Sequence, residues 1–179
     1  MKRLILAILA ASFAAGCATG RNEMLAAKLD RKSLRIGVET SFKPFIFRQD
    51  GRISGIEADF AREIGRLTGA EIQFVETKWE DLIPNLCEKK IDVIMSGMTV
   101  TEERSKKISF CSPYIVAGQM AVLRTTDIAE FSTGLKVIQT KKRIGFVKDT
   151  TGNFFVASRC VNAGKIPFDT PQQGINALL

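Results

Sequence analysis

The chain has 179 residues, of which 45% are hydrophobic, and its 26 lysines and arginines against 19 aspartates and glutamates give a net charge of +7. It contains no histidine, which excludes Ser-His-Asp and Cys-His catalysis and every zinc site with a histidine ligand. The basic residues are scattered apart from Lys141-Lys142-Arg143, a run typical of a solvated loop rather than of a nucleic-acid interface.

The first residues have the pattern of a bacterial export signal. A short basic start precedes an apolar run at 4–15 that is too short to anchor in a bilayer, and small residues then lead up to Cys17. We expect residues 1–16 to be a signal peptide. Its ending resembles the lipobox of bacterial lipoproteins, in which Cys17 would be lipidated. Ordinary signal cleavage, with Cys17 an incidental thiol, is the alternative.

The residues after Cys17 begin as a polar tether at 17–33 and continue as strand and helix signals in alternation. Without residues 1–16 the net charge is +5. The expected elements are a strand at 34–38, a turn at 50–51, a helix at 55–67 stopped by Gly69, a strand at 71–76, a helix at 79–88 and a strand at 91–95. Strands that alternate with helices predict parallel sheets in an α/β fold.

A second group of signals follows a more extended stretch near Tyr114. The expected elements are strands at 118–124 and 143–147, a helix at 153–163, a strand at 165–168, and a helix from Pro171 that Thr170 caps. The last helix still continues at Leu179, where no stop signal is present.

The segment Ser96–Arg104 follows the strand at 91–95 and carries the clearest binding signal. Small and hydroxylated residues come first, so backbone N–H groups are open to a ligand. Thr101 is suited to cap a helix, and Arg104 then offers a planar fork of donors. Hydroxyls, free amides and a guanidinium at the carboxyl end of a strand predict a carboxylate receptor.

Three cysteines remain after Cys17, namely Cys87, Cys111 and Cys160. They lack CxxC spacing, so we expect no metal site. In an oxidising compartment two of them could pair; buried free thiols are the alternative.

The segments together resemble one family, the bacterial extracellular solute-binding proteins of family 3, which are polar amino-acid receptors of ABC importers. The resemblance covers residues 34–179 and rests on several segments in the same order. They are Leu34–Phe45, Gly55–Phe60, Trp79–Leu86, Lys90–Ile94, Gly97–Arg104 and Phe110–Tyr114.

This resemblance implies a two-lobed α/β fold of the periplasmic-binding-protein type II, with parallel-sheet lobes joined by a hinge. It places the first lobe at 34–118, a hinge strand at 119–124 and the second lobe at 125–179. Family members continue past the helix that starts at Pro171. We therefore expect the fold to be incomplete at its C-terminus, to lack the acid that holds the ligand's ammonium group, and to be unstable or prone to aggregation.

The resemblance also implies how a ligand would be held between the lobes. Arg104 would grip the α-carboxylate with help from the Thr99 hydroxyl and the Gly97 N–H. Thr151 would meet the same carboxylate from a helix N-terminus, where capping the helix is the alternative role. Ser96 would accept from the α-amino group.

The side chain of the ligand would lie between two aromatic rings. Phe42 and Trp79 match the family's aromatic pair, whose flat faces favour an alkyl stem or a guanidinium. Glu39 matches a position that is often acidic in receptors for cationic amino acids. Phe42 and Trp79 as core residues, and Glu39 as a surface turn residue, are the alternatives.

The function implied is that of a non-catalytic receptor without cofactor or metal. It would be a lipid-anchored monomer in the periplasm or at the cell surface that passes a polar amino acid to an ABC permease of the inner membrane. Glu39 favours a cationic one among the polar amino acids. A cyclohexadienyl or arogenate dehydratase on the same fold is one alternative, with Glu39 as its candidate acid or base. A sensory ligand-binding module is another.

Overall fold

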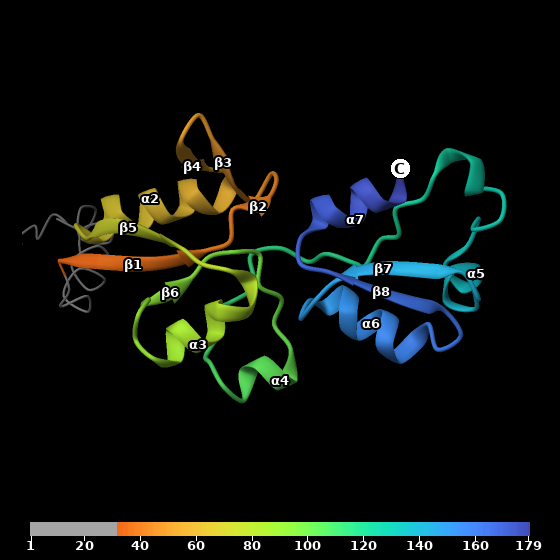
Figure 1. The fold of residues 1–179 in the computed structure, drawn as a ribbon. Helices are drawn as coiled ribbons and strands as arrows, with labels where there is room; N and C mark the ends of the chain where they lie inside the picture. Colours follow the sequence, from red (N-terminus) through yellow and green to blue (C-terminus); the bar gives the residue numbers. More distant parts are fainter. Residues whose placement is uncertain (1–31) are drawn as a thin grey trace, which may run out of the picture.

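The computed structural model describes residues 32–179, so the expected signal peptide, most of the tether and the lipidation site at Cys17 lie outside the described residues. Two groups of elements are connected by an extended stretch (Figure 1). We call the elements from β1 to α4 the first lobe and those from α5 to α7 the second lobe. No helix within residues 32–179 is long and apolar enough to cross a membrane.

The first lobe is built on a parallel sheet in the order β5-β1-β6. Its strands are β1 (Ser33–Val38), β5 (Glu71–Glu76) and β6 (Val93–Ile94). Leu34, Ile36 and Val38 alternate along β1 and are buried, which makes β1 the centre of the hydrophobic core. The parallel sheet expected from the alternating signals is confirmed, although β6 is shorter than the predicted strand at 91–95.

Helices cover both faces of this sheet (Figure 1). Helix α2 (Ile56–Thr68) packs on β5, and α3 (Leu82–Cys87), preceded by the 3-10 turn η1 (Trp79–Asp81), packs on β1. Gly69 ends α2 in the left-handed conformation, with φ 71°, as its position predicted. The helix expected at 79–88 is divided at Leu82, because η1 ends at Asp81 and α3 begins at Leu82.

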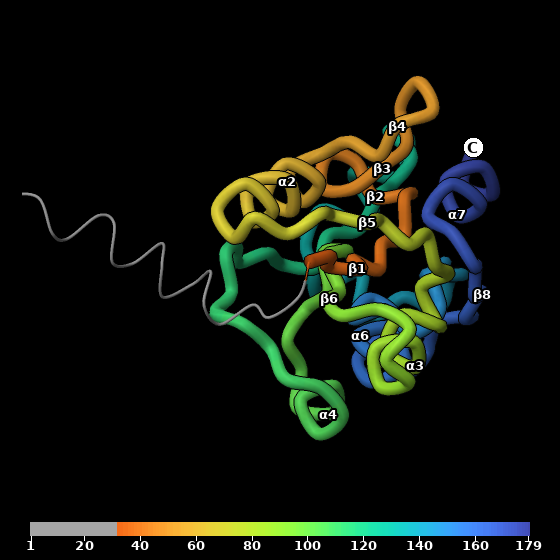
Figure 2. The backbone as a smooth tube through the Cα atoms, turned by 90° about the vertical axis from the view of Figure 1, so that its left-hand side faces the viewer, coloured from red at the N-terminus to blue at the C-terminus, as the bar shows by residue number. Residues whose placement is uncertain are grey.

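An antiparallel sheet that the sequence did not predict stands beside α2. It consists of β2 (Ser41–Phe42), β3 (Ile46–Gln49) and β4 (Arg52–Ser54) in the order β2-β3-β4. Asp50 and Gly51 form its tight turn with φ values of 49° and 75°, which agrees with the turn expected there. Figure 2 shows these strands at the end of α2, on the same side of the parallel sheet.

The second lobe has a smaller parallel sheet of β7 (Arg143–Val147) and β8 (Gly164–Phe168). Helix α6 (Thr151–Arg159) lies on one side and α7 (Pro171–Leu178) on the other (Figure 1). Val156, Cys160 and Ala163 form its small buried core. Thr170 caps α7 as predicted, whereas α6 occupies 151–159 rather than the expected 153–163.

Short helices and an extended stretch complete the chain. They are α4 (Glu102–Ser105), the 3-10 turn η2 (Thr125–Asp127) and α5 (Gly134–Ile138). The strand predicted at 118–124, and with it the hinge strand at 119–124, is wrong: this stretch pairs with no strand of residues 32–179. A strand needs a hydrogen-bonding neighbour, which β-propensity by itself does not supply.

The cysteines of the described chain are all free. Cys160 is buried in the second lobe, which agrees with the expectation of a buried thiol, while Cys87 and Cys111 are exposed. Within residues 32–179 no cluster of three or more cysteine, aspartate or glutamate side chains is placed to hold a metal ion.

Candidate functional site

The site begins where the parallel strands β1 and β6 end side by side. Glu39 follows β1 and Ser96 follows β6 closely, so the sheet register brings the two residues together. The Glu39 N–H donates to Ser96 Oγ at 2.9 Å, and the Ser96 hydroxyl lies 3.4 Å from the Glu39 carbonyl oxygen. Ser96 is 3% exposed, so its hydroxyl joins the loop after β6 to the backbone of the loop after β1.

Gly97 follows Ser96 and contacts the aromatic ring of Phe42. Its φ of +62° is a left-handed conformation that glycine adopts without strain. A Cβ atom at Gly97 would lie 2.7 Å from Cε1 of Phe42, so the ring rests directly on the glycine. The Gly97 N–H, predicted to serve a ligand, instead donates to Glu57 Oε1 at 3.0 Å.

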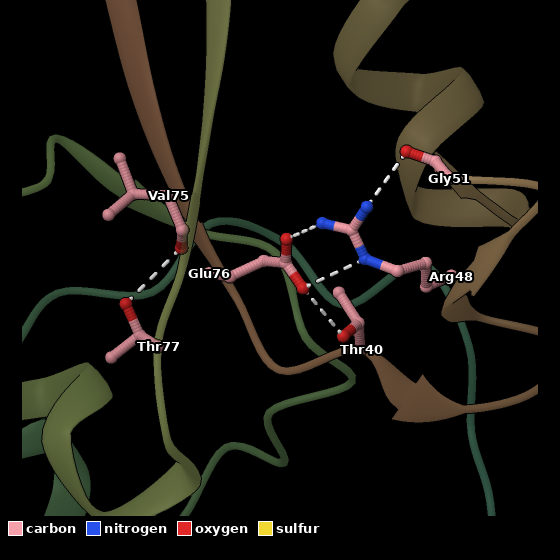
Figure 3. A network of polar contacts seen from close by, with 6 residues as sticks. All are labelled: Thr40, Arg48, Gly51, Val75, Glu76 and Thr77. Carbon is pink, nitrogen blue, oxygen red and sulfur yellow. Dashed lines mark hydrogen bonds and ion pairs between the residues drawn. The ribbon is translucent and has the colours of Figure 1, made fainter.

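Phe42 is held at this position by its own sheet. The Phe42 ring stacks on Phe45 with centroids 5.0 Å apart and is 42% exposed, which is inconsistent with a role as core residue. Arg48 of β3 forms an ion pair with Glu76 at the end of β5, and the Thr40 hydroxyl donates to the same carboxylate at 3.1 Å. Figure 3 shows this network, which ties the antiparallel sheet to the carboxyl edge of the parallel one.

Arg104 is the most buried cation of the described chain, with 8% of its surface exposed. The Thr101 hydroxyl caps α4 by accepting from the Arg104 N–H at 3.2 Å, as predicted. The guanidinium donates from Nη1 to the Thr99 carbonyl at 2.9 Å and from Nη2 to the Asp149 carbonyl at 3.0 Å. Burial lowers the pKa of Arg104, against the carboxylates of Asp149 and Glu103, which raise it. An arginine remains charged under such conditions.

Trp79 joins Arg104 at the boundary between the lobes. Its ring centroid lies 5.4 Å from the Arg104 guanidinium carbon, within the range of a cation–π contact. Its indole Nε1 donates to the Asp149 carbonyl at 3.0 Å. One backbone carbonyl of the second lobe therefore accepts from both Trp79 and Arg104 of the first.

Two cavities that are open to solvent lie at this junction of the lobes. A cavity of about 90 Å³ is lined by Trp79, Glu80, Ile83, Met98, Arg104 and Asp149. A neighbouring cavity of about 390 Å³ shares Glu80, Ile83, Arg104 and Asp149 with it and extends along α3 and α4 toward Phe154. Of the predicted residues, Arg104 and Trp79 line the smaller cavity, and the other six line neither.

Thr151 stands on the second-lobe side of the site. It is the first residue of α6, but Thr150 is the residue that caps the helix, by accepting from the Asn153 N–H. Capping therefore does not explain Thr151, and its hydroxyl accepts from Gln119 Nε2 at 2.9 Å. The structure thus brings the predicted residues together in two groups, while Thr151 is held by a different contact. One group is Glu39, Phe42, Ser96 and Gly97, and the other is Thr99, Arg104 and Trp79.

Sequence reasoning missed Asp149, Glu57 and Gln119. Asp149 acts through its backbone carbonyl, and its φ of +57° is not readable from the residue type. Its position directly after β7 and before a helix was the available signal, because loops at the carboxyl ends of parallel strands commonly carry binding groups. Glu57 lies in an amphipathic helix, where an acidic residue is usually solvated.

Comparison with known proteins shows similarity to bacterial solute-binding proteins. The family model described as bacterial extracellular solute-binding proteins, family 3, matches residues 34–164. The histidine-binding periplasmic protein of Salmonella typhimurium is 32% identical over 126 residues, which are 69% of this chain and 47% of that protein. The chain thus spans about half the length of such curated relatives.

Two solved structures have the same fold. The ancestral amino acid-binding protein AncCDT-1, described as a precursor of cyclohexadienyl dehydratase, matches with a TM-score of 0.80 and 28% identity, over 87% of this chain and 69% of that one. The arginine-bound form of truncated ArgBP from T. maritima matches with a TM-score of 0.72 and 33% identity, over 87% of this chain and 71% of that one.

Proposed function

The chain belongs to the bacterial extracellular solute-binding proteins of family 3, and from this premise we propose that it binds a polar, cationic amino acid between its lobes. In this role it delivers the ligand to an ABC permease and performs no chemistry on it. The observation that carries the proposal is Arg104, a buried guanidinium at a cavity between the lobes. Burying an arginine is costly unless its donors are used, and a ligand carboxylate is a suitable partner.

The surroundings of Arg104 support a carboxylate ligand. The Thr99 and Asp149 carbonyls take two of its N–H groups and fix the plane of the guanidinium, which leaves further donors for a carboxylate. The Trp79 ring covers the guanidinium, which lowers the local dielectric and strengthens a charge-assisted bond.

The preference for a cationic side chain rests on the other end of the site. Glu39 lies at the carboxyl edge of the parallel sheet, where Ser41 donates to its Oε2 from both hydroxyl and N–H, at 2.7 and 3.3 Å. The exposed face of Phe42 suits a cation or an alkyl stem. The histidine-binding and arginine-bound relatives agree with such a preference.

The test is a thermal-shift and calorimetric screen of the mature chain, residues 17–179, against L-arginine, L-lysine, L-histidine, L-glutamine, L-glutamate and prephenate. A ligand at 100 times its dissociation constant should stabilise the protein by about 2.7 kcal/mol, which corresponds to a rise in Tm of about 5–10 °C. We expect this rise with the cationic amino acids. No shift with any of the six compounds would contradict the proposal.

Arginine variants assign the carboxylate role. We expect Arg104→Ala to abolish the shift, and Arg104→Lys to weaken binding about 10- to 100-fold because lysine lacks the planar fork. Arg124→Lys is the matched control, since the Arg124 side chain is exposed and, within residues 32–179, forms only an ion pair with Asp127 at 3.7 Å. Equal affinity of the Arg104→Lys and Arg124→Lys variants would remove Arg104 from the site.

A dehydratase is the second candidate, because the structural match to AncCDT-1 includes a described link to cyclohexadienyl dehydratase. Such an enzyme needs a proton donor in the cleft, and Glu39 is the candidate. Incubation with prephenate and chromatographic detection of phenylpyruvate decides between the two. Turnover that is lost in Glu39→Gln would favour the enzyme; no turnover together with tight binding of an amino acid would favour the receptor.

We also propose that the protein is exported and held at a membrane through lipidated Cys17, as a monomer. The support is the lipobox-like ending of the first sixteen residues. Metabolic labelling with an alkyne-tagged fatty acid should mark the wild type and not Cys17→Ser. Equal labelling of the two, or none in either, would contradict lipidation.

A further inference from the structure

Glu57 is a buried carboxylate whose position a stable core does not explain. It is 3% exposed, and its Oε1 accepts from the Gly97 N–H at 3.0 Å. Its buried Oε2 has no hydrogen bond of good geometry among residues 32–179, although the Tyr114 hydroxyl interacts with this carboxylate. A buried charge with an unsatisfied oxygen destabilises a fold, so such a group in a native core calls for a reason.

The backbone of Glu57 has a second set of contacts. Glu57 lies in the first turn of α2, where the helix dipole favours a negative charge. Its N–H donates to the Phe45 carbonyl at 2.9 Å, and the neighbouring Ile56 N–H donates to the Pro44 carbonyl at 3.2 Å. Through these bonds the start of α2 holds the turn that carries the stacked pair of Phe42 and Phe45.

Glu57 therefore contacts two parts of the proposed site: the aromatic wall, which is the stacked pair of Phe42 and Phe45, and the loop after β6 that contains Gly97. The N–H of Glu57 fixes the aromatic wall through Phe45, and its carboxylate fixes the loop after β6 through Gly97. The ring of Phe42 rests on Gly97, so the two walls meet where Glu57 joins them. The Tyr114 hydroxyl interacts with the same carboxylate, and its partial burial together with Glu57 raises the pKa of Tyr114, although 52% of the residue's surface is exposed.

We infer that Glu57 is a positioning residue for amino-acid binding: it sets the loop from Ser96 to Thr99 and the Phe42 ring at the spacing that the ligand requires. This inference rests on the proposed function. Glu57 does not itself contact the ligand. Its side chain acts through Gly97, whose backbone conformation the carboxylate fixes and on which the Phe42 ring rests. The backbone bond to Phe45 remains in every variant at this position.

The test combines hydrogen exchange with affinity in three variants of the mature chain. Glu57→Leu removes the acceptor at similar size, Glu57→Gln keeps an oxygen that can accept from Gly97, and Tyr114→Phe removes only the neighbouring hydroxyl. We expect Glu57→Leu to speed exchange of the Gly97 amide at least about tenfold relative to the β1 amides, and to weaken binding of L-arginine, L-lysine or L-histidine about tenfold or more. Glu57→Gln should restore both, and Tyr114→Phe should leave Gly97 protected.

The outcomes separate this inference from the proposed function. Gly97 exchange that is unchanged in Glu57→Leu, or affinity that is unchanged although Gly97 is released, would overturn the positioning role. Failure of the wild type to bind any of the three amino acids, with Gly97 still protected by Glu57, would overturn the proposed function and leave a purely structural Glu57. If Glu57→Leu does not fold, a scalar coupling across the hydrogen bond between the Gly97 amide nitrogen and the Glu57 carboxylate carbon decides in the wild type, and its absence overturns the inference.

Discussion

Gly97 is restricted on one side by the Glu57 carboxylate and on the other by the ring of Phe42. Its left-handed φ excludes most side chains on conformational grounds, and the ring excludes even a methyl group on steric grounds. The residue therefore transmits the position of an aromatic side chain to the backbone of the loop that leads to Arg104.

We predict that Gly97→Ala destabilises the protein more than Gly51→Ala, although both glycines have positive φ, 62° and 75°. The left-handed alanine costs about 1–2 kcal/mol in either variant. At Gly97 the Cβ also strikes Phe42, whereas nothing lies within 4 Å at Gly51, so overpacking adds about 1–3 kcal/mol. Urea unfolding measures the difference. Equal losses of unfolding free energy in the two variants would show that the Phe42 ring moves aside without a measurable energetic penalty.

Arg104 illustrates what a residue type does and does not reveal. Its position after a capped helix start made it a predicted carboxylate ligand, and its burial agrees with a specific role. The two carbonyls that hold its guanidinium come from Thr99, five residues away, and Asp149, forty-five residues away. No property of the sequence near Arg104 indicates the second partner.

At the scale of elements, α4 presents Arg104 from a helix of four residues, which is too short to be stable without a cap. Thr101 supplies that cap, and Thr133 caps α5 in the same way, accepting from the Lys136 N–H at 3.4 Å. The two helices therefore form a matched pair, of which only α4 carries a proposed ligand residue.

We predict that Thr101→Ala and Thr133→Ala each destabilise the protein by about 1 kcal/mol, because each leaves a helix start uncapped. Thr101→Ala should in addition weaken binding of the amino acid identified in the screen about three- to tenfold, since α4 orients Arg104. Thr101→Ser, which keeps the accepting oxygen, should restore the affinity. Chemical denaturation and calorimetry measure both quantities, and an equal loss of affinity in Thr133→Ala would contradict the role of α4.

At the scale of the molecule, hydrogen bonds join the two lobes. Two N–H donors of the first lobe share one backbone carbonyl of the second lobe. Trp79 Nε1 and Arg104 Nη2 both lie 3.0 Å from the Asp149 oxygen. Such a contact favours the arrangement of the lobes in this structure, and a ligand that binds this arrangement more tightly than others would stabilise it further.

We predict that Trp79→Phe loosens the contact between the lobes while it preserves an aromatic face over Arg104. The loss of one hydrogen bond should cost about 0.5–1.5 kcal/mol, or about two- to tenfold in affinity. Trp79→Leu, which also removes the ring face, should weaken binding further. Small-angle scattering should show a larger radius of gyration for Trp79→Phe without ligand. Identical scattering and affinity in Trp79→Phe and wild type would show that the indole bond does not join the lobes.

The stretch between the lobes leaves apolar side chains in water. Every residue from Cys111 to Val122 is exposed, with Val116 at 96% and Met120 at 90%. An unpaired, uncharged, apolar segment of extended backbone is a site of association. If the protein aggregates as predicted, we expect association to begin at this segment.

We predict that the double substitution of Val116→Lys with Met120→Lys lowers concentration-dependent light scattering, because it places two charges in this segment. The free energy of unfolding should change by less than about 0.5 kcal/mol, since both side chains are exposed. The control is Ile128→Lys with Leu135→Lys, which adds the same charge at exposed sites outside the segment. Equal effects of the two pairs would assign the change to net charge.

The sequence by itself determined most of the elements and indicated a candidate site. The alternation of apolar residues in β1, the stop at Gly69, and the caps at Thr101 and Thr170 are local features, and local geometry depends on neighbouring residues that the sequence shows. The parallel sheet and the binding role of the segment from Ser96 to Arg104 were predicted from the same kind of signal. Residues 118–124 were predicted wrongly because a strand depends on a partner as well as on its own residues.

The tertiary structure alone decided which groups satisfy one another. It assigned the Gly97 N–H to Glu57 rather than leaving it free, the Ser96 hydroxyl to the backbone of Glu39, and Arg104 with Trp79 to the carbonyl of Asp149. These partners are forty or more residues apart in the chain, and a backbone carbonyl is present at every position. Only the packing of the lobes determines that the Asp149 carbonyl is the one that accepts from Arg104 and Trp79.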